Sequence, residues 1–100
     1  MQEKAKTIIC DIDGCISFHD GNINSIHLGD LKVLPFVKEK FKEWDRKGYN
    51  IILLTGRRES TRSYTEKQLA DAGIFYDELV MGVNNGPRVL INDRKPDSSE

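Results

Sequence analysis

Two carboxylates stand two positions apart at the end of an apolar run. In the stretch "TIICDIDGCI", residues 7–16, Asp11 and Asp13 follow isoleucines and a cysteine, and Gly14 comes directly after them. A carboxylate can act as a nucleophile, as an acid or base, or as a ligand of a hard cation such as Mg²⁺. A single pair of this kind is common, and most acids at strand ends are solvated turn residues. The pair indicates a site only if other polar groups join it.

Two further apolar runs also end in polar residues. "NIILLTG" ends at Thr55 and Gly56, and "RVLIND" ends at Asn92 and Asp93. In an open parallel sheet, ligands bind beyond the carboxyl ends of the strands, which lie along one edge. The three runs together therefore predict one site that combines carboxylates with a hydroxyl group.

The elements that must position these residues alternate along the chain. Continuous apolar runs of this length are typical of strands in a buried parallel sheet, and we expect four of them at residues 5–12, 50–56, 77–82 and 88–93. We expect the first of these strands to be buried on both faces. Residues 14–32 show no sustained periodicity and predict a long loop.

Two helices are expected between the strands. Val37, Phe41 and Trp44 recur at helical spacing, with Pro35 in the first turn and Gly48 at the end. The second helix is expected through about residues 59–72. Its inward face should carry Tyr64, Leu69 and Ala72, and Gly73 should end it.

This order predicts a small three-layer, Rossmann-like α/β domain. Strands joined by helices imply right-handed crossovers and a mostly parallel sheet of about four strands with helices on both sides. We expect residues 1–100 to form one domain, with the 16–32 loop over the site and residues 95–100 as a flexible tail.

The three motifs resemble those of the haloacid dehalogenase superfamily of phosphohydrolases. "IICDIDGC" is similar to the first motif, "IILLTGR" to the second and "VLINDRKPD" to the fourth, in the expected order over residues 7–97. The resemblance implies a phosphatase that depends on Mg²⁺ and works through an aspartyl-phosphate intermediate.

The resemblance also implies a role for each matched residue. Asp11 is the implied nucleophile, and Asp13 is the implied general acid that protonates the leaving oxygen and later activates water. Asp11, the backbone carbonyl of Asp13, and Asp93 are the implied Mg²⁺ ligands. The Thr55 hydroxyl and the Gly56 amide are the implied donors to the phosphoryl oxygens. Phosphate monoesters hydrolyse very slowly unaided, so a nucleophile, a proton donor and charge neutralisation are all needed.

The chain departs from the family pattern at the third motif, a Lys or Arg that neutralises the phosphate. Arg88 is the first choice because it lies just before the expected fourth strand, and Lys67 and Lys95 are the alternatives. In the fourth motif, Asn92 could bind the metal through its amide oxygen, and Asp97 could assist through water.

Three more residues beside the motifs call for interpretation. Cys15 stands where members of the superfamily often have Thr. Arg57 or Arg58 could line the phosphate entrance, although arginines at such a helix start are usually solvent-facing.

A cap domain sets substrate choice in many members of the superfamily. Residues 14–34 are too few for a full cap, and only one helix and one strand are expected between Gly56 and Arg88. We therefore expect an open site, roofed by the 16–32 loop or by another subunit, so that a homo-oligomer is one way to enclose it.

Composition limits the partners. The net charge is −1 and no basic stripe exists, so charge gives no indication of a nucleic-acid partner. The longest apolar runs are too short for a membrane-spanning helix, and the charged start "MQEKAKT" does not read as a secretory signal. The two cysteines fit reduced thiols in a cytoplasmic protein.

The leading prediction is a phosphomonoesterase that acts on a phosphorylated small molecule, such as a sugar phosphate or a nucleotide. "TGRRESTR" followed by "YDELVMG" looks like the phosphatase half of polynucleotide kinase-phosphatases, so a polynucleotide-end phosphatase is the alternative, against which the missing basic groove argues. A non-catalytic phosphate- or metal-binding module is the third reading. Asp13 argues against it, because binding alone does not need a second carboxylate placed for proton transfer.

Overall fold

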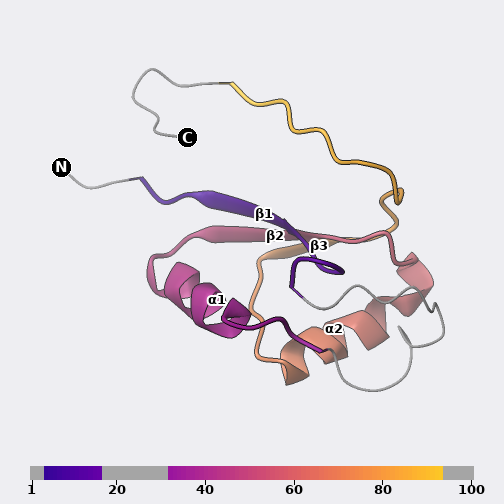
Figure 1. Ribbon diagram of the computed structural model, residues 1–100, viewed down its shortest axis with the longest axis horizontal. Helices are drawn as coiled ribbons and strands as arrows, with labels where there is room; N and C mark the ends of the chain where they lie inside the picture. Colours follow the sequence, from indigo (N-terminus) through magenta and orange to yellow (C-terminus); the bar gives the residue numbers. More distant parts are fainter. Residues whose placement is uncertain (1–3, 17–31, 94–100) are drawn as a thin grey trace.

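Three apolar runs form a parallel β-sheet. The computed structural model describes residues 4–16 and 32–93 (Figure 1). Within these ranges the elements are, in chain order, β1 (Thr7–Asp11), α1 (Val37–Arg46), β2 (Asn50–Leu54), the 3₁₀ helix η2 (Glu59–Thr61), α2 (Arg62–Asp71) and β3 (Glu78–Val80). The strand order is β1-β2-β3, with both pairs parallel. The predicted α/β class with a parallel sheet is therefore confirmed.

The strand register places partnered side chains of neighbouring strands on the same face of the sheet. Ile8 lies opposite Ile51, and Leu53 lies opposite both Cys10 and Leu79. Because side chains alternate along a strand, these residues share one face of the sheet. The three that come from β2 and β3 are buried, and Ile8 and Cys10 pack against the same core.

Both helices cover this one face. Figure 1 shows α1 and α2 on the same side of the sheet, as two right-handed crossovers that proceed in one direction across a sheet require. Phe41 of α1 and Leu69 of α2 are buried in the core between the helices and the strands. The described residues therefore form two layers, and the expected third layer of helices is not found among them.

The opposite face of the sheet carries apolar side chains with little cover. Ile9 is 50% exposed, and Ile52, Leu54 and Val80 on the same face are partly exposed. The prediction that the first strand is buried on both faces was wrong, because an uncovered face follows from placing both helices on the other side.

The helix ends follow the sequence closely. Gly48 and Gly73 have φ of 73° and 76°, a left-handed conformation that glycine adopts without a Cβ penalty. The amide of Tyr49 donates to the carbonyl of Trp44, and that of Ile74 to the carbonyl of Leu69, as in Schellman motifs. Both predicted helix ends are confirmed.

The inward face of α2 differs from the expectation. Leu69 and Ala72 are buried as predicted, whereas Tyr64 is 45% exposed. Its predicted place facing the core is taken by two polar residues, Thr65 and Gln68, which are 1% and 6% exposed.

The expected fourth strand does not form. Residues 87–93 have no strand pairing, and Val89, Leu90 and Ile91 are 81%, 76% and 92% exposed. A parallel strand needs a connection of about a dozen residues or more, usually a helix. Residues 81–87 offer fewer than that, so the chain leaves β3 and extends away from the sheet (Figure 1).

Most of the expected 16–32 loop and the 95–100 tail lie outside the described residues. In the described part of the chain, no helix combines the length and the apolar character that crossing a membrane requires.

Candidate active site at the carboxyl edge of the sheet

The carboxyl ends of the strands meet at one edge. Beyond the strands, the amide of Ile12 donates to the carbonyl of Leu54 at 3.0 Å, and the amide of Thr55 donates to the carbonyl of Val80 at 3.0 Å. These bonds hold the residues that follow β1 and β2 side by side. The first and second motifs are thereby brought together, as the sequence predicted.

A tight turn follows the first motif. The amide of Ile16 donates to the carbonyl of Ile12 at 2.9 Å, and both side chains are fully buried. Gly14 sits at the exposed tip with φ of 94°, which a residue with a Cβ rarely adopts. The two isoleucines anchor the turn while Asp11 and Asp13 remain accessible on either side of Ile12.

Asp11 is paired with the predicted third-motif cation. The Arg88 Nε donates to Asp11 Oδ1 at 3.2 Å, and the two side chains are 31% and 33% exposed. Arg88 also donates to the carbonyls of Asn84 and Gly86. The guanidinium is therefore held beside the candidate nucleophile by the backbone of its own segment.

Asp13 is paired with Arg57 through two parallel hydrogen bonds. Arg57 Nε donates to Asp13 Oδ2 at 3.1 Å, and Nη2 donates to Oδ1 at 2.9 Å. The Arg57 side chain is 4% exposed and that of Asp13 is 27% exposed. A buried guanidinium thus supports a carboxylate that solvent can reach.

Thr55 is buried rather than open to solvent. It is 2% exposed, and its hydroxyl oxygen accepts the amide hydrogen of Arg57 at 3.1 Å. The hydroxyl oxygen thus stabilises the turn after β2. Its predicted donation to a phosphoryl oxygen stays a prediction.

Gly56 lies where another segment crosses. A Cβ on Gly56 would overlap the side-chain amide of Asn85 and lie 2.9 Å from the carbonyl oxygen of Val83. The glycine is therefore required by the close approach of residues 83–85, in addition to any contact with phosphate.

Three of the remaining predicted residues, Lys67, Asn92 and Asp93, lie in the described part of the chain and do not join this edge. Lys67 pairs with Asp71 on the exposed side of α2 at 2.9 Å. Asn92 and Asp93 are exposed at the end of the extended segment. Lys95 and Asp97 lie outside the described residues. Because the expected fourth strand does not form, the sheet does not bring Asn92 and Asp93 to the edge that holds Asp11.

The described residues do not supply a complete magnesium site. Within residues 4–16 and 32–93, no group of three His, Cys, Asp or Glu side chains is arranged to hold a metal ion. Both oxygens of Asp13 accept hydrogen bonds from Arg57, and Asp11 is bonded to Arg88. The described residues alone therefore do not complete a site for a divalent cation, and we assign no reaction step to one. The magnesium requirement stays a prediction.

The thiol beside the candidate nucleophile is a poor acid. Burial, together with the negative charges that Cys15 and Asp11 carry when ionised, raises the pKa of Cys10 to about 11. The Cys10 Sγ donates to the carbonyl of Asp11 at 3.3 Å. Cys10 is therefore a structural neighbour of the site.

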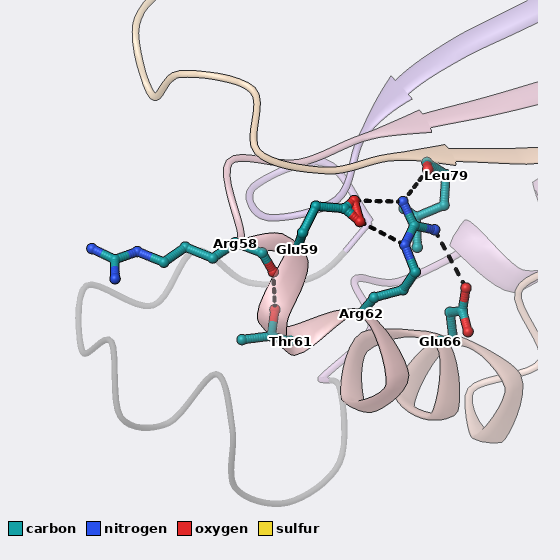
Figure 2. Close-up of polar contacts among 6 residues, drawn as sticks. All are labelled: Arg58, Glu59, Thr61, Arg62, Glu66 and Leu79. Carbon is teal, nitrogen blue, oxygen red and sulfur yellow. Dashed lines mark hydrogen bonds and ion pairs between the residues drawn. The ribbon is translucent and has the colours of Figure 1, made fainter.

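A cluster of ion pairs fixes the start of α2 against β3 (Figure 2). Arg62 donates to both carboxylate oxygens of Glu59, to Glu66 and to the carbonyl of Leu79. The hydrogen bonds from Arg62 lower the pKa of Glu59, and those to Glu59 raise the pKa of Arg62. The contact with Leu79 orients α2 relative to the sheet.

The side chain of Arg58 takes no part in the ion pairs that Glu59 and Arg62 form. Figure 2 shows its side chain extending away from Glu59 and Arg62. It is exposed, and among the described residues its guanidinium has no carboxylate partner. The backbone carbonyl of Arg58 accepts the hydroxyl hydrogen of Thr61 at 2.8 Å, which fixes the turn that carries it.

Sequence reasoning gave Arg57 too small a role. Its Nη1 donates to Thr65 Oγ1 at 3.2 Å and to Gln68 Oε1 at 2.7 Å. The sequence does contain an indication of this role: Thr65 and Gln68 lie one helical turn apart, on the helix face that also carries Leu69. Two polar residues at buried positions imply a buried polar partner.

A hollow in the described surface lies elsewhere. Its lining comes from the turn before α1, the first turn of α1 and the end of α2: Val33, Leu34, Phe36, Lys38, Glu39, Asp71 and Ala72. The lining contains none of the residues of the candidate active site, so the hollow is a separate feature.

The fold is similar to that of chains from an RNA repair assembly. One match is to a chain in the structure of the Pnkp1/Rnl/Hen1 RNA repair complex, with a TM-score of 0.67 and 35% identity over 84% of this chain and 28% of that chain. Another, in a structure of the Pnkp1/Rnl/Hen1 complex, has a TM-score of 0.66 and 32% identity over 88% of this chain and 32% of that chain. The chain therefore spans less than a third of the length of either neighbour.

No family model and no curated protein matches the sequence.

Proposed function

We propose that this chain is a phosphatase that removes a terminal phosphate from a polynucleotide. The observation that carries the chemistry is the partly exposed Asp11 carboxylate with the Arg88 guanidinium beside it. A carboxylate can attack phosphorus only where a cation offsets the repulsion between two anions, and Arg88 supplies that charge. The likeness to RNA repair chains supports a polynucleotide as the substrate over a small metabolite.

The proposed reaction has two displacements. Asp11 attacks phosphorus, the bond from phosphorus to the leaving oxygen breaks, and Asp13 gives that oxygen a proton. Asp13 then takes a proton from water, which attacks the aspartyl-phosphate and releases inorganic phosphate and Asp11. These roles follow the resemblance to the haloacid dehalogenase superfamily, and they fit two neighbouring carboxylates of different surroundings.

The modest charge of the chain is compatible with this substrate. The net charge is −1, which argues against a long basic groove. An enzyme that acts at the end of a strand needs the terminal phosphate and a few neighbouring contacts. Arg88 at the site and Arg58, the sequence neighbour of Arg57, are exposed or partly exposed cations that can provide them.

A substrate panel tests the proposal. Phosphate release is measured from short RNA and DNA strands with a 3′- or a 5′-phosphate, from a sugar phosphate, from a nucleoside monophosphate and from p-nitrophenyl phosphate. Each is measured with Mg²⁺ and with EDTA, because the sequence resemblance predicts a magnesium requirement. We expect kcat/KM for one class of strand end to exceed that for the small metabolites by at least about tenfold.

The matched variants are Asp11→Asn and Asp45→Asn. The first should lower the rate at least about a thousandfold, because a carboxamide cannot attack phosphorus. Asp45 is exposed on α1, away from the carboxyl edge of the sheet, and its variant should keep the activity of the unaltered chain. Turnover of a sugar phosphate or nucleotide in preference to all strand ends would instead support the small-metabolite phosphatase, and no turnover of any substrate would overturn the proposed chemistry.

A further inference from the structure

We propose that Arg57 is a positioning residue for the Asp13 carboxylate during proton transfer, an inference that rests on the proposed phosphatase function. Arg57 acts on the substrate only through Asp13. Its guanidinium fixes the plane of the carboxylate and the side from which a leaving oxygen can approach it.

The contact between the two residues is of the kind that fixes orientation. Arg57 Nε and Nη2 bond to the two oxygens of Asp13 at 3.1 and 2.9 Å. Two parallel hydrogen bonds from a planar donor define the plane of the carboxylate, whereas a single bond leaves it free to rotate. Each carboxylate oxygen keeps a second lone pair, which is open to a proton on the exposed side.

The guanidinium itself cannot turn. Its Nη1 donates to Thr65 and to Gln68, both buried on α2. The Arg57 side chain is 4% exposed, and leaving any of its hydrogens unpaired there would cost free energy. The orientation of Asp13 is therefore tied to the position of α2.

The backbone of Arg57 is fixed as well. Its amide donates to Thr55 Oγ1 at 3.1 Å, and its carbonyl accepts the amide hydrogen of Gly82 at 2.8 Å. Arg57 thus joins the turn after β1, the ends of β2 and β3, and the inward face of α2.

The exposures of the two side chains distinguish this pair from an ion pair of the core. Asp13 is 27% exposed and Arg57 is 4% exposed. A pair with a purely structural role would gain nothing from one accessible partner. Here the accessible partner is the group to which the mechanism assigns proton transfer.

The test compares leaving groups. Nitrophenolate leaves without a proton, whereas the sugar hydroxyl of a polynucleotide end needs one. Proton donation by Asp13 therefore matters only for the second substrate, while the later activation of water by Asp13 is common to both. General acid catalysis contributes about 10²–10⁴-fold. We expect Arg57→Lys to lower kcat at least about tenfold more on the phosphorylated strand than on p-nitrophenyl phosphate, with KM within about twofold for both. Lysine keeps the positive charge and loses the two-point contact.

A double substitution tests whether Arg57 acts through Asp13. If it does, Arg57→Lys should cause almost no further loss of kcat on the strand when Asp13→Asn is already present. Equal losses on both substrates, or additive losses in the double variant, would overturn the positioning role and leave the phosphatase function standing. An inactive unaltered chain would overturn both.

Two further variants separate positioning from folding. Glu66→Gln removes an ion pair to Arg62 on α2 that does not touch Asp13 and leaves the contact of Arg62 with Leu79 in place. This variant should slightly reduce thermal stability without changing the ratio of the two rates. Thr65→Val removes one hydrogen bond to Arg57 and keeps the shape of the side chain. If Arg57→Lys does not fold, Thr65→Val takes its place in the test. It should lower kcat by a smaller factor than expected for Arg57→Lys, and more on the strand than on p-nitrophenyl phosphate. An equal loss of kcat on both substrates would contradict the proposal.

Discussion

Arg57 and Arg58 are adjacent in the chain and have opposite surroundings. The backbone of Arg58 is extended, with φ of −71° and ψ of 148°, and successive side chains of an extended chain point in opposite directions. Arg57 therefore enters the protein and pairs with Asp13, while Arg58 faces solvent. The inward residue can organise the site, and the outward residue can meet a substrate.

The exposed Arg58 is predicted to contact the phosphodiester backbone of the substrate. Arg58→Ala should raise KM for a phosphorylated strand about three- to tenfold and leave turnover of p-nitrophenyl phosphate unchanged. It should also reduce the slope of log KM against log salt by about one, as expected for one lost phosphate contact. Steady-state kinetics at several salt concentrations measure both effects. Arg46→Ala, at the exposed end of α1, is the control, and an equal change in that variant would contradict the assignment.

The two cysteines are predicted to differ in reactivity. The thiolate is the reactive form, and the pKa of Cys10 is raised to about 11, so this thiol stays protonated at neutral pH. Cys15 is exposed. At pH 8, iodoacetamide should therefore modify Cys15 first, and modification of Cys10 should accelerate about tenfold per pH unit up to about 11. Mass spectrometry of digested protein measures both, and equal labelling at pH 8 would disagree with the burial of Cys10.

The residues of the first two motifs were predictable because each sits directly at a strand end. Asp11, Asp13 and Thr55 lie at the expected edge. Arg88 contacts Asp11, although the fourth strand that was expected to position it does not form. The role of Arg57 was not foreseen, because a run of two arginines gives no indication of which one turns inward. Arg57 is the inward residue because it bonds to Thr65 and Gln68, which lie 8 and 11 residues further along the chain but next to it in space.

At the level of elements, the approach of residues 83–85 to the end of β2 makes Gly56 sensitive to substitution. Gly56→Ala places a methyl group against Asn85 and the carbonyl of Val83. We expect a loss of about 1–3 kcal/mol in the free energy of unfolding, the usual range for overpacking. Gly86→Ala is the control, since a Cβ there has no neighbour within 4 Å. Urea unfolding with unchanged m-values measures the difference, and equal stability of the two variants would contradict the close crossing.

The start of α1 contains a strained residue. Phe36 has φ of 68°, the left-handed conformation, and is 80% exposed. The left-handed conformation costs a residue with a Cβ about 1–2 kcal/mol, which exceeds the extra chain entropy of glycine. Phe36→Gly should therefore raise the free energy of unfolding by about 0.5–1 kcal/mol.

Phe75→Gly is the matched control, because Phe75 is 56% exposed and has no positive φ. That variant should be less stable than the unaltered chain. Thermal unfolding of the two variants measures the contrast, and a loss of stability in both would argue against strain at Phe36.

Elements with internal periodicity or a stop residue were predictable, and the element that depends on its connection was not. Both helices and three strands occur near their expected places. Residues 88–93 have the apolar character of a strand, yet no crossover helix precedes them. Whether a strand joins a parallel sheet depends on the length of the preceding connection as well as on its apolar residues. The apolar pattern of residues 88–93 contains no information about that length.

At the scale of the whole molecule, β2 has a special place. It is the central strand, with β1 and β3 on its two sides. Among the described residues, β1 has a hydrogen-bonded neighbour on one side only. We expect the amide hydrogens of β2 to exchange with deuterium more slowly than those of β1 and β3, because only β2 has paired groups on both sides. Exchange followed by NMR or mass spectrometry measures this order, and equal protection of β1 would show that a further strand covers its outer edge.

The position of β1 also determines how the protein would fail on warming. The candidate nucleophile stands at the end of an edge strand, whereas the central strand ends just before Thr55. Fraying of that edge would disperse the two acids while the middle of the sheet is still intact. Loss of the proposed activity should then precede global melting, and cooling from that interval should restore this activity without a refolding step.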